Sequence, residues 1–487
     1  MPPIRRCPAC DTVARAETCE VCGAVLRGHE VAAPAPRTLV SLALDLLRVD
    51  LREHLSLLAF LAKWAVLGSV VGVLAGASSA VFLYGLMLVS DARAAEPGLL
   101  FALPLGGLVI GWAYHRFGGR SSAGNNLILD EIHGIGRHMD RPGRVPFRLA
   151  PLVLVGTWVT HLFGGSAGRE GTAIQLSASL SDAFARLVRI EADDRRLLLV
   201  AAVSGGFASV FGVPLAGFVF GLEVRSVGRI RYDAIVPALT AAVVGHLVVE
   251  AIGLPHDVTP AYELAATGFD GGVLARVALA GVVFGAVSLL FSELVDGVRR
   301  TFAVLVPSAP LRPFVGGVLV VVLTLVIGST DYLGLSLGLI DDALTGADLL
   351  WFAFALKLLF TAVTLGSGFQ GGEVTPLFVI GATLGAALAG PLGLDTGVLA
   401  SVGFVAVFAA ATNTPLACVV MGLELFGVGA LGEIAVGCVT AYVVSAHRGI
   451  YGAQRIDTAK HPRRNELTGR VLRDLGAERR FRRRRRR

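Results

Sequence analysis

Charged residues are scarce in this chain. Only 16% of its 487 residues are Asp, Glu, Lys or Arg, and 54% are hydrophobic. In ordinary soluble domains about a quarter of the residues are charged. The composition therefore excludes a typical soluble domain and indicates a protein that is largely embedded in a lipid bilayer.

The N-terminus lacks the apolar run of a secretory signal. Residues 1–37 are polar, and the first apolar run starts only after Leu39. We therefore expect no cleavable signal peptide and an N-terminus that stays in the cytosol. The chain ends on the basic run Arg482–Arg487, and further arginines such as Arg189 and Arg299 fit short basic loops. Positive charge beside apolar segments predicts that these loops and the C-terminus also lie in the cytosol.

Apolar runs near the length of a membrane span recur along the chain. A spanning helix needs about 20 apolar residues, and runs such as Leu58–Val89, Leu197–Glu223 and Ala234–Ile252 approach or exceed that length. Gly and Pro interrupt several of them. The sequence predicts an all-α polytopic membrane protein whose transport domain covers residues 55–455.

Cysteine is rare, and four of the six cysteines form two CxxC pairs separated by eight residues. They are Cys7, Cys10, Cys19 and Cys22. Each CxxC turn can direct two thiolates at one tetrahedral metal. We therefore expect residues 1–30 to form a zinc-ribbon-like module around a structural Zn2+. Redox-active thiols and disulfides are the alternatives, and a cytosolic location argues against disulfides.

Two polar segments flank the predicted transport domain. Residues 31–54 include the amphipathic stretch Thr38–His54, which predicts a linker followed by an interfacial helix. Residues 456–487 form a basic tail that could contact anionic lipid or nucleic acid. Only Phe481 interrupts the arginine-rich run. Because aromatic residues are otherwise missing there, we expect a solvated tail or a membrane-lipid contact, and no nucleic-acid partner.

The two halves of the apolar region repeat each other at an offset of 201 residues. The aligned pairs include Gly165 and Gly366, Phe207 and Phe408, Pro214 and Pro415, and Glu223 and Glu424. Duplicated units are common in transporters. The sequence leaves parallel and inverted repeats open. We favour inversion, because it brings equivalent broken helices together near the midplane.

Each half places one glutamate beside a cluster of glycines: Glu170 in the first and Glu373 in the second. An ionisable residue inside a membrane is costly and is by default a functional-site hypothesis. The glycines before Thr172 and Pro376 are expected to open two helices, so that free N–H groups and positive dipole ends face one point. Such a point binds an anion. An ionised glutamate would compete with that anion, and a protonated one would leave the site free.

Structural roles are the alternative for these carboxylates. Glu170 could form a buried pair with Arg169, and Glu373 could cap its own helix. For Glu223 and Glu424 we favour a structural role, in which matching helix ends supply acceptors for backbone or loop donors.

The segment Gly168–Thr172, which reads GREGT, resembles the GREGP signature of the CLC chloride channels and proton-coupled transporters. Gly372–Pro376 is similar to the family's GxFxP signature, and its GSGIP signature falls at Gly124–Ile128. The resemblance implies a homodimer with one anion pathway per subunit, inverted repeats with broken helices that meet at the midplane, and Glu170 as a proton-operated gate. The anion site it implies comprises Gly124, Asn125, Asn126, Gly168, Arg169, Gly171, Thr172, Val374, Thr375 and Tyr451.

Several positions depart from the chloride-transporting pattern. Asn125 stands where those proteins use a ligand serine, Val374 where they have an aromatic residue, and Val224 where many have an inner proton-relay glutamate. The combination is similar to the bacterial fluoride-exporting CLC branch, in which a glutamate precedes that valine. It implies that Glu373 is a second protonatable group. Fluoride is small and strongly hydrated, and the Asn125 amide and the Thr375 hydroxyl are donors that could replace its water.

We therefore expect a proton-coupled antiporter, not an enzyme, that exports fluoride across a bacterial inner membrane with both termini in the cytosol. A chloride/proton exchanger or a voltage-insensitive chloride channel is the alternative within transport. A membrane-anchored regulator that uses the zinc module is the alternative from another class.

Overall fold

The computed structural model describes residues 5–6, 13–14, 51–134, 143–255 and 270–476. The chain divides into two compact units, residues 1–62 and 63–487. In the first unit, β1 (Arg5–Arg6) pairs antiparallel with β2 (Val13–Ala14). The four cysteines of the predicted zinc module lie outside the described residues, as do most of the predicted linker and the arginine-rich end of the tail.

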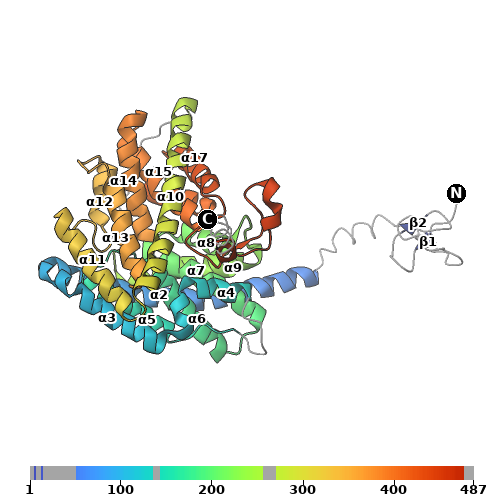
Figure 1. Cartoon of the computed structure of the whole chain (residues 1–487). Coiled ribbons are helices and arrows are strands. Elements are labelled where there is room, and N and C mark those ends of the chain that lie inside the picture. The colour runs from blue at the N-terminus through green and yellow to red at the C-terminus, as the bar shows by residue number, and fades with distance from the viewer. Residues whose placement is uncertain (1–4, 7–12, 15–50, 135–142, 256–269, 477–487) are drawn as a thin grey trace. The chain divides into compact units, whose positions relative to one another are not determined.

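The described chain is predominantly helical (Figure 1). Its α-helices are α2 (Leu51–Ala95), α3 (Leu103–Ala113), α4 (Asn125–His133), α5 (Leu149–Leu162), α6 (Glu170–Leu187), α7 (Ala192–Phe211), α8 (Pro214–Glu223), α9 (Ile235–Ile252), α10 (Gly271–Leu305), α11 (Leu311–Ile327), α12 (Leu337–Thr345), α13 (Ala353–Ser367), α14 (Val374–Leu392), α15 (Thr396–Thr412), α16 (Pro415–Phe426) and α17 (Leu431–Val444).

Short elements connect these helices. The 3-10 turns are η1 (Pro97–Ala102), η3 (Gly119–Ala123), η5 (Tyr232–Ala234) and η6 (Pro462–Leu467), and η2 (Tyr114–Gly118) is a π-helical turn. The strand β3 (Ser226–Val227) pairs in parallel with β4 (Arg455–Ile456).

Five helical stretches of the described chain are long and apolar enough to cross a membrane. They are His54–Ala95, Pro97–His133, Tyr232–Ile252, Gly271–Leu305 and Val374–Leu392. Shorter apolar helices accompany them. Large apolar side chains such as Val66, Leu105 and Val326 are exposed, as expected for groups that face lipid. The prediction of a predominantly helical protein with several apolar helices of membrane-spanning length is confirmed.

The helices α5 to α9 have counterparts in α13 to α17, which confirms the internal repeat. Within each half the same packing recurs: α6 lies against α7 in the first, and α14 lies against α15 in the second (Figure 1). The halves meet at equivalent residues. The rings of Phe207 and Phe408, which the alignment pairs, stack with their centroids 6.0 Å apart.

The two halves also cap each other's helices. The carboxylate of Glu424, in α16, accepts hydrogen bonds from the backbone N–H groups of Leu215 (2.9 Å) and Ala216 (2.7 Å) at the start of α8. Reciprocally, Glu223, the last residue of α8, accepts from Leu416 (3.2 Å) and Ala417 (2.9 Å) at the start of α16. The first helical residue of each is proline and has no N–H, so these bonds satisfy the next two free donors.

This exchange has two consequences. The end of α8 lies at the start of α16 and the end of α16 near the start of α8, so the equivalent helices run in opposite directions, as inverted repeats require. The predicted structural role of Glu223 and Glu424 is confirmed.

Residues 445–476, beyond α17, fold back onto the helices before them. Val227 of β3 packs with Ile456, Leu467 and Leu472 in a small apolar cluster. Arg473 forms a two-bond ion pair with Asp130 of α4, at 2.9 and 3.0 Å. Residues 456–476 of the segment predicted as a tail therefore pack against the helices that precede them.

Candidate anion site

The two glycine-flanked loops are joined directly to each other. The N–H of Gly168 donates to the carbonyl of Gly372 (2.7 Å), and the N–H of Gly372 donates to the carbonyl of Gly168 (2.6 Å). Helix α6 begins two residues after the first glycine and α14 two residues after the second. The prediction that two helix N-termini face a common point is confirmed.

Close approach of the two loops depends on glycine. A Cβ atom on Gly372 would lie 2.7 Å from Glu170 Oε2 and 3.0 Å from the backbone nitrogens of Glu170 and Gly171. Any larger residue would displace the start of α6.

The side chain of Glu170 reaches across to the N-terminus of α14. Its Oε2 accepts hydrogen bonds from the N–H groups of Thr375 (3.1 Å) and Arg169 (3.2 Å). Its Oε1 accepts from the Thr375 hydroxyl. All three residues are fully buried. A carboxylate thus occupies donors that, at the positive end of a helix, would otherwise bind an anion.

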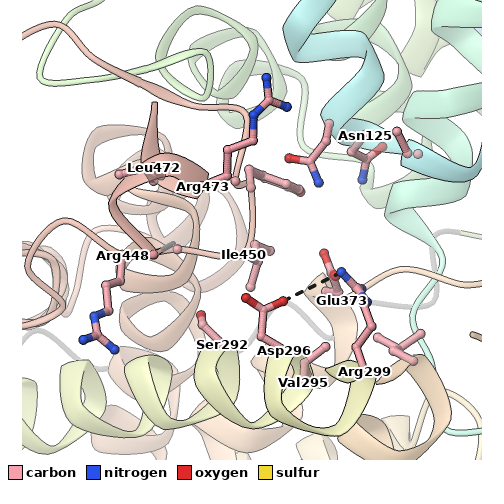
Figure 2. A pocket seen from close by; sticks show the side chains of 18 of the residues that line it. Asn125, Ser292, Val295, Asp296, Arg299, Glu373, Arg448, Ile450, Leu472 and Arg473 are labelled. Carbon is pink, nitrogen blue, oxygen red and sulfur yellow. Dashed lines mark ion pairs between the residues drawn. The ribbon is translucent and has the colours of Figure 1, made fainter. Parts of the chain in front are cut away.

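A cavity of about 550 Å³ adjoins this point. Its lining includes Gly124 and Asn125 from the start of α4, Gln175 from α6, Glu373 and Tyr451. Residues from α10 and from the folded segment beyond α17, including Asp296, Arg448 and Arg473, complete the wall (Figure 2).

Asn125 is the first residue of α4. It follows Gly124, whose φ of 53° is a left-handed value that favours glycine. The Asn125 side-chain oxygen is buried and has no hydrogen-bond partner among the described residues. The amide nitrogen points toward α6, because it would lie 3.1 Å from a Cβ on Gly171. The Asn125 amide therefore lies between the N-termini of α4 and α6.

Two of the predicted ligands have other partners. The side-chain oxygen of Asn126 accepts a hydrogen bond from the N–H of Ala453 (2.8 Å), so Asn126 holds the segment beyond α17. The Thr172 hydroxyl bonds to the hydroxyl of Thr157 in α5 (2.7 Å). Val374 and Tyr451 are buried beside the site, and Tyr451 interacts electrostatically with both Glu170 and Glu373.

Glu373 lines the cavity immediately before α14. Its side chain accepts no capping hydrogen bond from that helix, so the capping alternative is wrong for this residue. The charged groups that act on it are Arg299 and Asp296 of α10. Figure 2 shows their side chains and Glu373 pointing into the same part of the cavity.

Sequence reasoning missed these α10 residues. Asp296 and Arg299 form an i,i+3 ion pair, with Oδ1 and Nη1 3.8 Å apart. The interpretation of Arg299 as part of a short basic loop is wrong, because α10 continues to Leu305. Glu293, Asp296 and Arg299 recur at helical spacing after an apolar stretch, and this pattern could have predicted a polar helix face. Gln175, one helical turn beyond Gly171, was also missed.

Residues 106–446 match the family model described as voltage gated chloride channel. The chain is 46% identical over 417 residues to a chloride/fluoride channel protein of Pseudomonas syringae pv. tomato, covering 84% of this chain and 90% of that protein. It is 29% identical over 390 residues to an H+/Cl− exchange transporter of Vibrio vulnificus, covering 74% and 81%.

Among solved structures, a CLC-type fluoride/proton antiporter matches with a TM-score of 0.75 and 34% identity, covering 81% of this chain and 98% of that one. A slow cyanobacterial Cl−/H+ antiporter matches with a TM-score of 0.66 at 20% identity, covering 86% and 97%.

Proposed function

Because this chain belongs to the voltage-gated chloride channel family, the CLC family, we propose that it exports fluoride from the cytosol in exchange for protons. The 46% identical relative is named a chloride/fluoride channel protein, and the 34% identical structure is that of a fluoride/proton antiporter. Transport, not enzymatic chemistry, is the activity that this family supports.

The single observation that carries the proposal is the position of the Glu170 carboxylate. It accepts hydrogen bonds from the N–H and the hydroxyl of Thr375, two donors at the start of α14. An anion that binds there must displace the ionised carboxylate. Protonation removes the negative charge of Glu170 and weakens its hold on these donors, so proton binding and anion binding are coupled.

The donors fit fluoride better than chloride. Fluoride is small, so its water must be replaced by close and strong hydrogen-bond donors. The Asn125 amide, the Thr375 hydroxyl and backbone N–H groups are such donors, and none carries a full charge that would hold the ion too long for turnover.

Glu373 is the second protonatable group of the proposed mechanism. Position 224, which holds a relay glutamate in many chloride exchangers, is valine here. Glu373 makes no capping bond and faces the cavity beside Asp296 and Arg299. Protons that leave Glu170 can therefore pass to Glu373 and from there to water in the cavity.

Purified protein in liposomes tests the choice of anion. Liposomes loaded with fluoride should release it far faster than matched liposomes release chloride. An anion electrode measures the release of each ion. Chloride release at an equal rate would favour a chloride/proton exchanger, as the 29% identical relative is named.

We propose the same topology and assembly that the family resemblance implies: a homodimer in a bacterial inner membrane, with both termini in the cytosol. Light scattering of the detergent-solubilised protein measures the subunit number. Accessibility of single cysteines placed at either terminus measures the orientation.

We also propose that residues 1–30 bind one Zn2+ through Cys7, Cys10, Cys19 and Cys22, in a module separate from transport. Metal analysis of the purified protein should give one zinc per chain, and none after all four cysteines are changed to serine. Deletion of residues 1–37 should leave fluoride flux intact. Loss of flux would instead favour the regulator that acts through this module.

A further inference from the structure

A second cavity, of about 790 Å³, lies beyond the C-terminal end of α17. It is formed between that end and the folded segment that follows. The lining residues are Val443, Ala446, His447, Arg448, Lys460, His461, Arg463, Arg464, Glu466, Leu467, Arg470 and Leu475. Nothing in the proposed transport mechanism uses this cavity.

The residues that line the cavity are predominantly positively charged. Five cationic side chains face a single carboxylate, Glu466. That carboxylate is already within 3.5 Å of Arg464, and Arg448 pairs with Glu293 outside the cavity lining. The guanidinium of Arg463 forms no ion pair with the described residues. Among the described residues, the positive charge of Arg463 is therefore not neutralised by an ion pair.

The ammonium of Lys460 contacts neutral groups of α17 and of the residue that follows it. This ammonium donates to the carbonyl of Tyr442 (2.6 Å) and to the hydroxyl of Ser445 (3.0 Å), and it lies 3.8 Å from the centre of the Tyr442 ring. All these partners are neutral. Burial among them lowers the pKa of Lys460 to about 6, because an ammonium ion is costly without a counter-charge. A bound anion would favour the charged form.

An apolar strip leads into this basic cavity. Val439 and Val443 lie one turn apart on α17 and are 50% and 56% exposed. Val443 also lines the cavity. Since α17 is apolar and ends here, the cavity lies where an apolar helix gives way to polar chain. An acyl chain fits the strip, and a phosphate fits the cations at its end.

We propose that this cavity binds the phosphate headgroup of an anionic phospholipid. The headgroup phosphate accepts hydrogen bonds from Lys460 and Arg463, and the acyl chains follow Val443 and Val439 along α17. Basic pockets beside membrane helices on the cytosolic side take such headgroups, and the cavity volume lies within the range of small-molecule sites.

The test uses the full-length protein in detergent micelles. Native mass spectrometry measures binding of phosphatidylglycerol, cardiolipin and the zwitterionic phosphatidylethanolamine, with inorganic pyrophosphate as a soluble competitor. We expect both anionic lipids to bind more tightly than phosphatidylethanolamine. Arg463→Gln should weaken anionic lipid binding about fivefold, as expected for one basic group at a membrane surface.

Arg189→Gln is the matched control, because Arg189 is an exposed arginine outside the cavity. It should leave lipid binding unchanged. Lys460→Met should weaken lipid binding more than Arg463→Gln does. Because the Arg463 side chain is exposed, Arg463→Gln should leave folding intact, so its effect reports lipid binding alone. Equal binding of anionic and zwitterionic lipids, or equal effects of Arg463→Gln and Arg189→Gln, would overturn the proposal. Saturable pyrophosphate binding without lipid binding would reassign the cavity to a soluble phosphate and reject the lipid.

Discussion

Glu170 is the residue on which the proposed coupling depends. Glutamine at this position keeps the shape of the side chain and removes its titration. We expect Glu170→Gln to reduce proton transport to the level of protein-free liposomes and to alter fluoride flux strongly, because the neutral amide cannot bind or release a proton beside the Thr375 donors. Simultaneous pH and fluoride electrodes measure both fluxes. Proton-coupled exchange at the wild-type rate would remove Glu170 from the mechanism.

Glu373 tests whether the second carboxylate acts in transport or in stability. Its side chain makes no capping bond, and the charges of Arg299 and Asp296 act on it in opposite directions, so Glu373→Gln should shift the unfolding temperature by less than about 2 °C. Proton-coupled fluoride transport should nevertheless fall. A large loss of thermal stability with normal transport would show that the carboxylate is structural.

These two residues also show what the sequence could predict. An acidic residue among glycines between apolar runs identified Glu170 and Glu373 without a structure. The roles of Asn126 and Thr172 could not be predicted in this way. Their partners, Ala453 and Thr157, come from other segments of the chain, and only the fold brings them together.

At the scale of helices, the exchanged caps are the feature most open to test. Glu424→Ala leaves two N–H groups at the start of α8 without an acceptor. Loss of a cap of this kind costs about 1 kcal/mol, and we expect a lower unfolding temperature in detergent. Glu250→Ala is the control, because that side chain is 65% exposed on α9. Equal unfolding temperatures for the two variants would contradict the capping role.

The junction between the two loops gives a second test at this scale. Gly372→Ala places a Cβ 2.7 Å from the Glu170 carboxylate and 3.0 Å from two backbone nitrogens, so it should abolish fluoride transport by displacing the start of α6. Gly390→Ala lies on the same helix, α14, where a Cβ meets nothing within 4 Å, and should transport normally. Normal transport by Gly372→Ala would refute the close packing of this junction.

The helices themselves were largely predictable. The offset of 201 residues anticipated the pairing of α6 with α14 and of α8 with α16, because apolar runs broken at equivalent Gly and Pro positions form equivalent elements. The polar face of α10 was not anticipated. Its charged end was read as a loop, since charge after an apolar run usually marks the membrane boundary. Here the helix continues, and the charges line the cavity.

At the scale of the whole molecule, two inverted halves build one site from parts that neither half contains. The first half supplies Glu170 and Asn125, and the second supplies Thr375 and Glu373. The segment beyond α17 closes the cavity wall with Tyr451 and Arg473. The sequence predicted that Tyr451 joins the site. It did not predict that residues 456–476 fold onto the helices, because Arg473 and its partner Asp130 are 343 residues apart in the sequence.

The most direct test of the central claim is proton-driven fluoride transport in liposomes. With fluoride at equal concentration on both sides and an imposed pH gradient, the protein should drive fluoride out of the more alkaline compartment as protons enter it. Glu170→Gln liposomes should show no such movement. The contradicting result is fluoride that does not move under the pH gradient, although the same liposomes release fluoride down a fluoride gradient. The protein would then be a passive channel and not an exchanger.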